Sequence, residues 1–498
     1  MLTDALDKAG NVHFKFQTSK DNQYSEITDL IILVNNDVKG YYCFNPVKMK
    51  KRTFLKLSSS VLTGVALAPL TECVPDKKRE TLKNWAGNLT YSTSNVREPV
   101  SVEQVQEIVR ASDKLRALGT RHCFNTIADS DTMLVSTRSL NDFHEPDAAL
   151  SNITVGAGIR YGDLCRYLDE RGFALHNLAS LPHISVAGAC ATATHGSGVQ
   201  NGNLATAVSA IEFVSGKGEI VHLSRAKDGD LFHGAVVSLG SLGIVTKITL
   251  DLVPSFSVRQ NVYLNLPVSQ LEQHFDEIMS SGYSVSLFTD WQTENMNQLW
   301  IKRKVSEGEK FKADEEFFGA KLSDRDVHPI IEISAKNCTE QMGVAGPWYE
   351  RLPHFKMDFT PSSGEELQAE YFVPREKAFE AIKAVETLRE DLKNLLFITE
   401  IRTVEADQLW MSMSYRRPSV AIHFTLKQDV PGVKSFLPKL EETLSPFEPR
   451  PHWGKLFALQ PSVLHSRYER YRDFLALASQ YDPEGKFRNA FMNENFFT

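Results

Sequence analysis

Apolar positions recur at helix or strand spacing along most of the chain from residue 84 onward. Val102, Val105 and Val109 fall on one face of a predicted helix, because a helix brings residues three and four apart together. Ser101 precedes this helix and Gln104 follows three positions later, which is the pattern of a capping box. The same rules predict strands at 114–119 and 152–158, a helix at 161–172, a hairpin pairing 207–214 with 219–223, and an alternating strand at 243–252.

The pattern changes after Pro254. Strands at 285–288, 299–302, 397–401 and 420–425 are mixed with helices such as 375–388. They do not alternate strictly, which predicts an α+β fold rather than repeated βαβ units. The chain has 498 residues, too many for one ordinary core, so two domains are expected, with the first ending near Pro254.

Composition narrows the class of protein. Hydrophobic residues make up 42% and charged residues 23%, the balance of a globular enzyme. The net charge of −7 offers no basic surface for nucleic acid, so no such partner is expected. The six cysteines are dispersed, with no CxxC pair and no histidine cluster at zinc-ligand spacing, so neither a metal site nor a disulfide framework is expected.

The first 77 residues differ from the rest. Residues 1–48 form an N-terminal extension in which we find no chemistry. From Met49 a basic head, an apolar run and small residues follow in the order of an export signal, and Lys51-Arg52 resembles a twin-arginine signal with one Arg replaced by Lys. The hypothesis is translation from Met49, a signal over 49–77 and export to the periplasm. The alternative is a cytoplasmic protein with a helix packed on its surface, and the run is too short for stable membrane insertion.

Two segments of the first domain carry candidate chemistry. Residues 119–125 form a short polar loop after a predicted strand and contain His122. Between Val186 and Gly198 small and hydroxyl residues predominate, which lets backbone N–H groups approach a bound phosphate closely. A lone loop histidine is more often structural, and a run of small residues can be a linker. Neither segment alone identifies a binding or catalytic site.

Together these segments resemble a known family. The motifs are Gly-Thr-Arg-His-Cys-Phe-Asn at 119–125, Ser-Leu-Pro-His-Ile-Ser-Val-Ala-Gly at 180–188 and Thr-His-Gly-Ser-Gly at 194–198. They resemble the FAD domain of the vanillyl-alcohol-oxidase superfamily, most of all its alditol oxidases and more loosely its aldonolactone oxidases. The resemblance spans about 84–492. It implies a PCMH-type FAD-binding domain at 78–256, an antiparallel-sheet substrate domain at 257–455, and a C-terminal return to the FAD-binding domain at 456–498.

The resemblance also implies an FAD cofactor. In this superfamily the histidine at the position of His122 bonds covalently to the 8α carbon of the flavin. The family usually has Gly-His-Ser where this chain has Arg-His-Cys at 121–123. The other FAD contacts that the resemblance implies are Ala117, Leu118, Gly119, Thr120, Arg121, Cys123, Ser180, Ser185, Gly188, Ala189, Cys190, Ala191, His195 and Val245.

Polar residues at period two mark two strands of the second domain. Glu400 and Arg402 project to one face of the first strand, and His423 and Thr425 to one face of the second, while the opposite faces are apolar. Taken alone, Glu400 and Arg402 are readily interpreted as a surface ion pair. The resemblance implies instead that all four residues line an alditol-oxidase substrate pocket, together with Ser180 and Lys455.

These residue types suit the oxidation of an alcohol. Arg402 and Lys455 would favour the alkoxide, Lys455 would also stabilise charge on the reduced flavin, and His423 is a candidate acid/base or orienting group. We therefore predict a monomeric enzyme that oxidises the primary alcohol of a small polyol to an aldehyde and reduces O2 to H2O2. The alternatives are an aldonolactone oxidase, a dehydrogenase with another electron acceptor, and a flavin-binding protein without turnover.

Overall fold

The computed structural model describes residues 24–26, 48–50 and 81–498, apart from 150, 307, 358–365 and 498. The chain divides into two units, Met1–Lys78 and Arg79–Thr498. In the first unit β1 (Tyr24–Glu26) pairs antiparallel with β2 (Lys48–Lys50). Beyond Lys50 the predicted export signal lies outside the described residues. Among the helices that are described, none is long and apolar enough to cross a membrane.

The second unit begins with two sheets and the helices between their strands. The first sheet is parallel and the second antiparallel, in the order β6-β10-β8-β9. The strands are β3 (Val96–Arg97), β4 (Arg116–Leu118) and β5 (Leu134–Ser136), then β6 (Asn152–Gly156), β8 (Val208–Ser215), β9 (Ile220–Ser224) and β10 (Gly243–Asp251). A separate pair joins β7 (Phe173–Ala174) to β11 (Val253–Pro254), and the helices are α2 (Val102–Arg110), α3 (Tyr161–Asp169), α4 (Val186–Ala191) and α5 (Arg225–Val236).

Local signals predicted these elements well. Ser101 Oγ accepts a hydrogen bond from the Gln104 amide at 3.4 Å, and Gln104 Oε1 accepts one from the Val100 amide at 2.9 Å, so the predicted N-cap is confirmed. The predicted hairpin is also confirmed, with Val214 opposite Ile220. The small-residue segment that begins at Val186 was given no secondary structure by the sequence, and its first six residues form the short helix α4.

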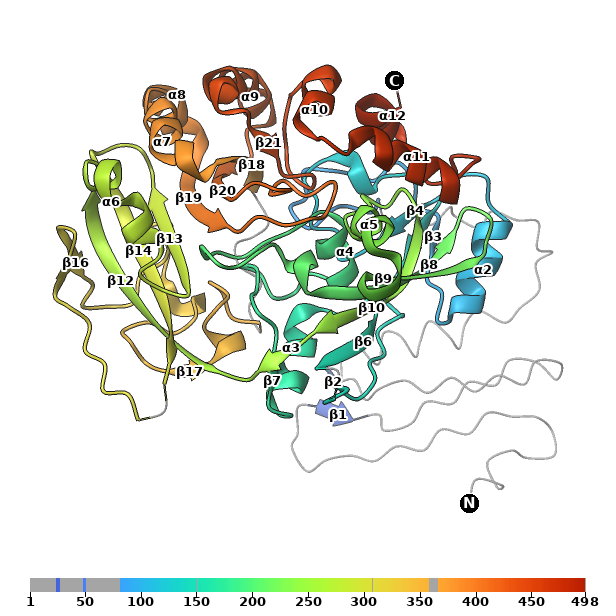
Figure 1. Cartoon of the computed structure of the whole chain (residues 1–498), viewed down its shortest axis with the longest axis horizontal. Helices are drawn as coiled ribbons and strands as arrows, with labels where there is room; N and C mark the ends of the chain where they lie inside the picture. Colours follow the sequence, from blue (N-terminus) through green and yellow to red (C-terminus); the bar gives the residue numbers. More distant parts are fainter. Residues whose placement is uncertain are drawn as a thin grey trace. The chain divides into compact units, whose positions relative to one another are not determined.

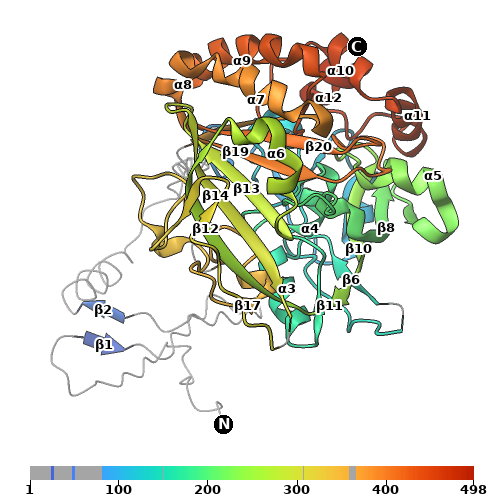
Figure 2. The same ribbon diagram turned by 60° about the vertical axis from the view of Figure 1, so that its left-hand side comes forward.

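A large antiparallel sheet follows, in the order β15-β16-β12-β14-β13-β19-β20-β18-β21, with β17 beside β12. It contains β12 (Ser257–Pro267), β13 (Ser284–Thr289), β14 (Asn295–Val305), β15 (Glu316–Phe317), β16 (Ala320–Leu322), β17 (Gly346–Pro347), β18 (Glu366–Pro374), β19 (Leu396–Val404), β20 (Ser419–Lys427) and β21 (Arg450–Pro451). One face packs against α6 (Gln270–Met279), α7 (Ala378–Glu386), α8 (Arg389–Leu395) and α9 (Val430–Leu444) (Figures 1 and 2). The α+β class and the antiparallel substrate-side sheet are therefore confirmed.

The two faces of this sheet differ in polarity. Ile401, Ile422 and Phe424 are fully buried in the core that the helices cover. Side chains alternate between faces along a strand, so the intervening residues must lie on the other face. The strand register places Glu370, His423 and Glu400 opposite one another on β18, β20 and β19. The fold thus gathers three titratable side chains from distant segments into one row.

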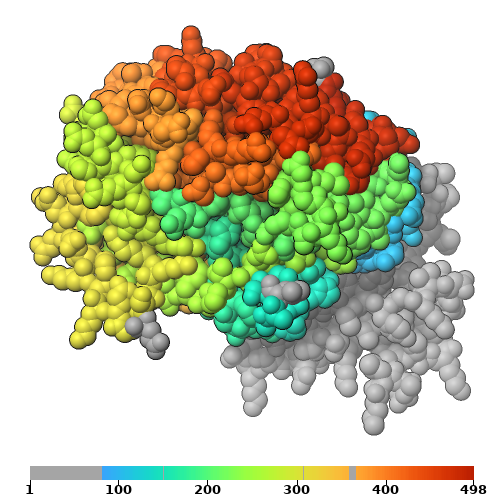
Figure 3. Space-filling view, in the orientation of Figure 1, coloured from blue at the N-terminus to red at the C-terminus, as the bar shows by residue number. Residues whose placement is uncertain are grey.

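The last helices, α10 (Pro461–Arg467), α11 (Tyr471–Tyr481) and α12 (Ala490–Phe496), pack near the first sheets. The residues from about 370 onward, orange to red in Figure 3, lie along the top of the view. Between α11 and α12, residues 486–487 contact β4 and the residue before it. The Leu115 amide donates to the Lys486 carbonyl at 3.0 Å, and Arg116 of β4 donates to the Phe487 carbonyl at 2.7 Å. The C-terminal segment therefore supports the strand that leads into the His122 loop.

Buried Arg116 joins this segment to the rest of the unit. It is 2% exposed, and burial lowers its pKa to about 10. Its guanidinium donates to four backbone carbonyl groups, those of Ile127, Leu239, Gly240 and Phe487. We predict that Arg116→Met removes a donor from each of these carbonyls, of which that of Ile127 keeps the Asn489 amide as a second donor. The free energy of unfolding should fall by roughly 3 kcal/mol or more, since each buried unsatisfied group costs ~1–3 kcal/mol. Urea denaturation of the full chain measures this change.

Arg472→Met is the matched control. Arg472 is exposed and makes no hydrogen bond or ion pair with another residue in the described ranges. The same change there should alter the free energy of unfolding by less than about 0.5 kcal/mol. Equal losses in the two variants would contradict the role assigned to Arg116.

Candidate active site

A cavity of about 340 Å³ lies between the loops of the first sheets and the polar face of the large sheet. Such a volume is typical of small-molecule sites. From the first part of the chain, its lining includes Ala117, Leu118, Gly119, Thr120, Arg121, His122, Cys123, Ser180, Ser185, Gly188, Ala189, Ala191, His195 and Val245. From the second part, it includes Glu400, Arg402, His423, Thr425 and Lys455. The structure thus brings the two predicted sets of residues to one cavity.

Cys190 is the predicted contact that does not reach this cavity. Its side chain is 1% exposed, and its Sγ lies 3.6 Å from the hydroxyl of Tyr161 on α3. Gly188, Ala189 and Ala191 of the same helix do line the cavity. Because α4 is helical, position 190 turns toward the core, and no helix had been predicted in this segment from the sequence.

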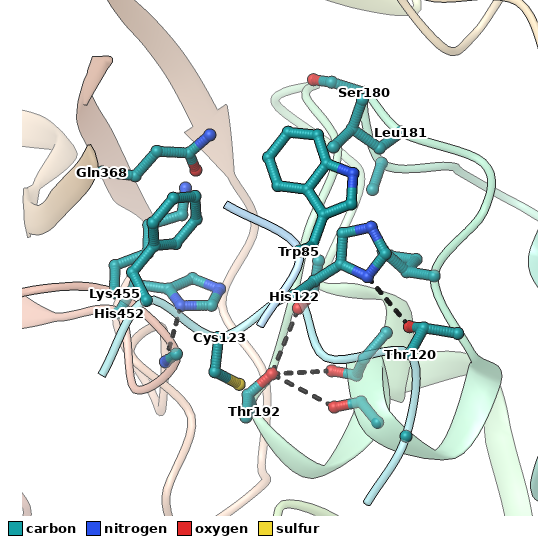
Figure 4. A pocket seen from close by; sticks show the side chains of 18 of the residues that line it. Trp85, Thr120, His122, Cys123, Ser180, Leu181, Thr192, Gln368, His452 and Lys455 are labelled. Carbon is teal, nitrogen blue, oxygen red and sulfur yellow. Dashed lines mark hydrogen bonds between the residues drawn. The ribbon is translucent and has the colours of Figure 1, made fainter. Parts of the chain in front are cut away.

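The His122 imidazole is held at the wall of the cavity. Its Nδ1 lies 3.0 Å from Thr120 Oγ1, and its ring stacks on Trp85 with centroids 5.3 Å apart (Figure 4). Burial, with a smaller effect from His183, lowers the His122 pKa to about 3, so the ring is neutral near pH 7. Its Nε2 is buried without a hydrogen-bond partner among the described residues. One ring nitrogen is therefore anchored while the other is unpaired.

Arg121 occupies a backbone conformation that favours glycine. Its φ angle is +64°, in the left-handed region, where a side chain costs about 1–2 kcal/mol. Its carbonyl accepts a hydrogen bond from the Trp85 amide at 2.8 Å, which fixes the loop. Its guanidinium is exposed and donates to the Lys83 carbonyl at 3.1 Å. The Arg side chain that replaces the family's usual glycine is therefore anchored at the surface.

Two glycines make a narrow backbone cradle beside this loop. A Cβ atom added at Gly119 would lie 2.7 Å from Ser185 Oγ, and one at Gly188 would lie 2.8 Å from the same atom. Thr120 Oγ1 also accepts a hydrogen bond from the Ser185 amide at 3.2 Å. The two glycines therefore let the 119–123 loop and the start of α4 pack closely around Ser185, and both place their backbone at the cavity wall. Together with the unpaired His122 nitrogen, this cradle fits FAD.

Across the cavity, Glu370 is the central group that sequence reasoning missed. It is 0% exposed, and its Oε1 accepts a hydrogen bond from Arg402 at 2.7 Å. Its Oε2 accepts one from Lys455 Nζ at 2.8 Å, and His195 Nε2 lies 3.2 Å from Oε1. Arg402 is farther from its predicted partner Glu400, at 3.5 Å. Glu370 thus links three of the predicted residues.

The charges of this group balance. Burial acts to raise the pKa of Glu370, but Lys455, His195 and Arg402 outweigh it and hold that pKa well below its usual range. The same opposition between burial and the neighbouring Arg402 holds the pKa of Glu400 well below its usual range. Both carboxyl groups are therefore ionised near pH 7. Their two negative charges offset the positive charges of Arg402 and Lys455.

His423 faces the same space as a neutral imidazole. Burial, assisted by the charge of Lys455, lowers its pKa to about 4. Neither ring nitrogen has a hydrogen-bond partner within the described part of the chain, and Nδ1 lies 3.9 Å from Glu400 Oε2. Near pH 7 His423 can accept a proton but carries no extra proton to donate.

Gln368 and His452 line the cavity but were not predicted. They lie with the predicted Lys455 across the cavity from His122 and Trp85 (Figure 4). Gln368 and Glu370 alternate with buried apolar residues on β18, which is the period-two pattern that identified Glu400 and Arg402. That signal would have found both. Trp85, Phe288 and His354 also line the cavity and were not predicted.

The chain matches two family models. The FAD binding domain family covers residues 93–224, and the D-arabinono-1,4-lactone oxidase family covers residues 355–495. An alditol oxidase of Streptomyces sp. is 44% identical over 414 residues, which are 82% of this chain and 98% of that protein. An L-gulono-1,4-lactone dehydrogenase of Mycobacterium tuberculosis is 26% identical over 82% of this chain and 96% of its own length. The L-gulonolactone oxidase of Mus musculus is 24% identical over 83% and 98%.

The fold has a solved counterpart. A cholesterol oxidase from B. sterolicum superposes with a TM-score of 0.68 at 15% identity, over 86% of this chain and 100% of that chain. The matched FAD-binding region contains His122 and the glycine cradle, and the second matched region contains Glu370, Arg402 and Lys455. This chain therefore belongs to the vanillyl-alcohol-oxidase superfamily of FAD-linked oxidoreductases and, within it, to the family of the alditol oxidases.

Proposed function

We propose that this enzyme oxidises the primary alcohol of a small neutral polyol to an aldehyde, with FAD covalently attached through His122 and O2 reduced to H2O2. The observation that carries the proposal is the charge-balanced group of Glu370, Arg402, Glu400 and Lys455, which faces the His122 loop across one cavity. The 44% identity to an alditol oxidase supports the same substrate class.

Charge balance favours a neutral substrate. Arg402 and Lys455 each already contact the buried carboxylate of Glu370, so the site has no uncompensated cation for a substrate carboxylate. Hydroxyl groups both donate and accept hydrogen bonds. Glu400 can accept from them, while Ser180, Gln368 and Thr425 offer further polar atoms at the cavity wall. A chain of hydroxyl groups matches this mixture better than a sugar acid does.

The side chains of the site can also accept the hydroxyl proton that is removed from the substrate. Oxidation removes one proton and one hydride from the CH–OH group; FAD, when bound, would supply the hydride acceptor and the route for both electrons to O2. The imidazole of His423 is neutral near pH 7, so it has an unprotonated ring nitrogen that can accept the hydroxyl proton. Arg402 and Lys455 stabilise the negative charge that develops on the oxygen. Alcohol and O2 thus yield aldehyde and H2O2.

The unpaired Nε2 of His122 supports the covalent link. This nitrogen is buried, and the low pKa of the ring keeps it unprotonated and nucleophilic near neutral pH. Thr120 and Trp85 hold the ring in one orientation. An imidazole that is anchored on one side and unpaired on the other is suited to bond formation.

The match to the D-arabinono-1,4-lactone oxidase family favours one other substrate class, aldonolactones. We predict that the full-length enzyme forms H2O2 from xylitol or sorbitol with a kcat/KM at least about tenfold above that for L-gulono-1,4-lactone or D-arabinono-1,4-lactone, since the neutral site is lined to bind several hydroxyl groups. Peroxide-coupled assays measure both rates.

A higher kcat/KM for a lactone than for xylitol or sorbitol would show that the substrates are aldonolactones rather than polyols. Reduction of an artificial dye by polyol without peroxide would assign the enzyme as a dehydrogenase. Failure with all of these substrates, in protein that carries FAD, would contradict the proposed function.

We predict that His122→Ala abolishes covalent flavin attachment while part of the FAD remains bound, because the cradle at Gly119 and Gly188 is unchanged. Acid precipitation followed by absorbance measures the result. Yellow colour should stay with the wild-type pellet and move to the supernatant of the variant.

His183→Ala is the matched control. The His183 ring lies 6.0 Å from that of His122. Its removal should leave the colour in the pellet. If the His122→Ala pellet stays yellow, or the wild-type pellet is colourless, the covalent link through His122 is wrong.

A further inference from the structure

A buried lysine lies behind the substrate side of the cavity. Lys302 on β14 is 1% exposed and does not line the cavity. Its Nζ donates to the carbonyl groups of Leu352 and Pro353 at 2.6 and 3.1 Å. Its third short contact is with His354 Nδ1, at 3.1 Å. Three acceptors therefore match the three N–H groups of an ammonium ion.

This arrangement determines the proton position on His354. An ammonium group can only donate, so Nδ1 of His354 must be the acceptor and carry no proton. The proton of the neutral ring then resides on Nε2, which lies 2.7 Å from Glu400 Oε1. Burial lowers the His354 pKa to about 4, so the ring holds one proton near pH 7. His354 therefore donates to Glu400.

The His354 ring is also fixed in direction. The rings of Trp300 and Phe288 lie edge-on to it, with centroids 5.2 and 5.6 Å away. Its backbone amide donates to the Ser180 carbonyl at 3.2 Å. The same residue thus contacts Glu400 through its side chain and Ser180 through its backbone. Both of these residues line the cavity.

We propose that Lys302 and His354 are positioning residues that hold Glu400 Oε1 and leave Oε2 to accept a hydrogen bond from a substrate hydroxyl group. Glu400 lines the cavity, and its Oε2 has His423 Nδ1 3.9 Å away, too far for a hydrogen bond. This inference rests on the proposed polyol oxidation. It assigns the recognition of a substrate hydroxyl to one carboxylate oxygen, set by two residues outside the reacting centre.

The hydrogen bonds that link Lys302 through His354 to Glu400 depend on pH. Burial lowers the Lys302 pKa to about 7, although Glu400 and Cys338 act to raise it and Arg402 acts to lower it further. Below pH 7 the ammonium form donates three hydrogen bonds. Above pH 7 the amine has only two N–H groups and gains a lone pair, so His354 can place its proton on Nδ1 instead. Glu400 then loses its donor, and the KM for the polyol should rise.

Kinetics of four variants test the proposal. Lys302→Met removes the donor, His354→Leu removes the link, and His354→Gln keeps an amide N–H for Glu400. Lys304→Met is the control, since Lys304 lies on the same strand with its Nζ against the rings of Phe256 and Tyr283. We expect the xylitol KM to rise about tenfold in the first two variants, with kcat changed less, and to stay within about threefold in His354→Gln and Lys304→Met.

The pH profile separates positioning from a purely structural role. The wild-type KM should rise as pH increases through about 7, whereas the KM of Lys302→Met should be flat over that range. Equal KM values in Lys302→Met, His354→Leu and Lys304→Met would overturn the proposal. So would a wild-type KM that does not change between pH 6 and 8.5, a range of about one unit or more on each side of the expected pKa.

A spectroscopic measurement keeps this test independent of turnover. Nitrogen-15 NMR of histidine-labelled wild-type protein, with His354→Gln identifying the signal, reports which ring nitrogen carries the proton. A proton on Nε2 at pH 6 supports the proposed hydrogen bonds from Lys302 to His354 and from His354 to Glu400. A proton on Nδ1 contradicts them. If the wild type oxidised no polyol, the proposed function would fail, while this readout would still decide whether Lys302 sets the His354 tautomer.

Discussion

The buried carboxylate of Glu370 is the constraint on which the site depends. An ion with no exposed surface is costly unless partners replace its water. Here Arg402 comes from the adjacent region of the sheet, Lys455 from the segment after β21, and His195 from the segment after α4. Satisfying one carboxylate therefore requires the large sheet, the C-terminal segment and the FAD-binding region to meet in one arrangement.

The same interaction shapes the chemistry. Glu370 holds two cations within reach of the reacting oxygen yet offsets part of their charge, so they stabilise a developing alkoxide without forming a site for anions. His423 and Glu400 complete the row across β18, β20 and β19. His354 contacts Glu400 Oε1 through its Nε2, and Lys302 contacts the other nitrogen of the same ring. A neutral, hydroxyl-rich substrate follows from this arrangement of charges.

Local patterns predicted much of this molecule. Period-two alternation placed Glu400, Arg402, His423 and Thr425 on the polar faces of their strands, and these side chains do meet in one cavity. Glu370 has the same pattern but no neighbour in sequence that reveals its role, because Lys455 is 85 residues away and His195 is 175 residues away. Cys190 was predicted as an FAD contact but does not line the cavity, because the helical turn that directs its side chain into the core was not predicted from the sequence. The sequence could not show which distant residues pair with Glu370, nor the direction in which the Cys190 side chain points.

The most direct test of this account is the substrate preference of Glu370→Gln, a change that keeps the shape of the side chain and removes its charge. The account predicts that kcat/KM for xylitol falls by about a hundredfold, since Arg402 and Lys455 lose their shared ionic partner. It also predicts that xylonate, a sugar acid that should not inhibit the wild type, becomes an inhibitor, because the two cations are then partly unbalanced. An unchanged kcat/KM for xylitol together with no inhibition by xylonate would contradict the central role of Glu370.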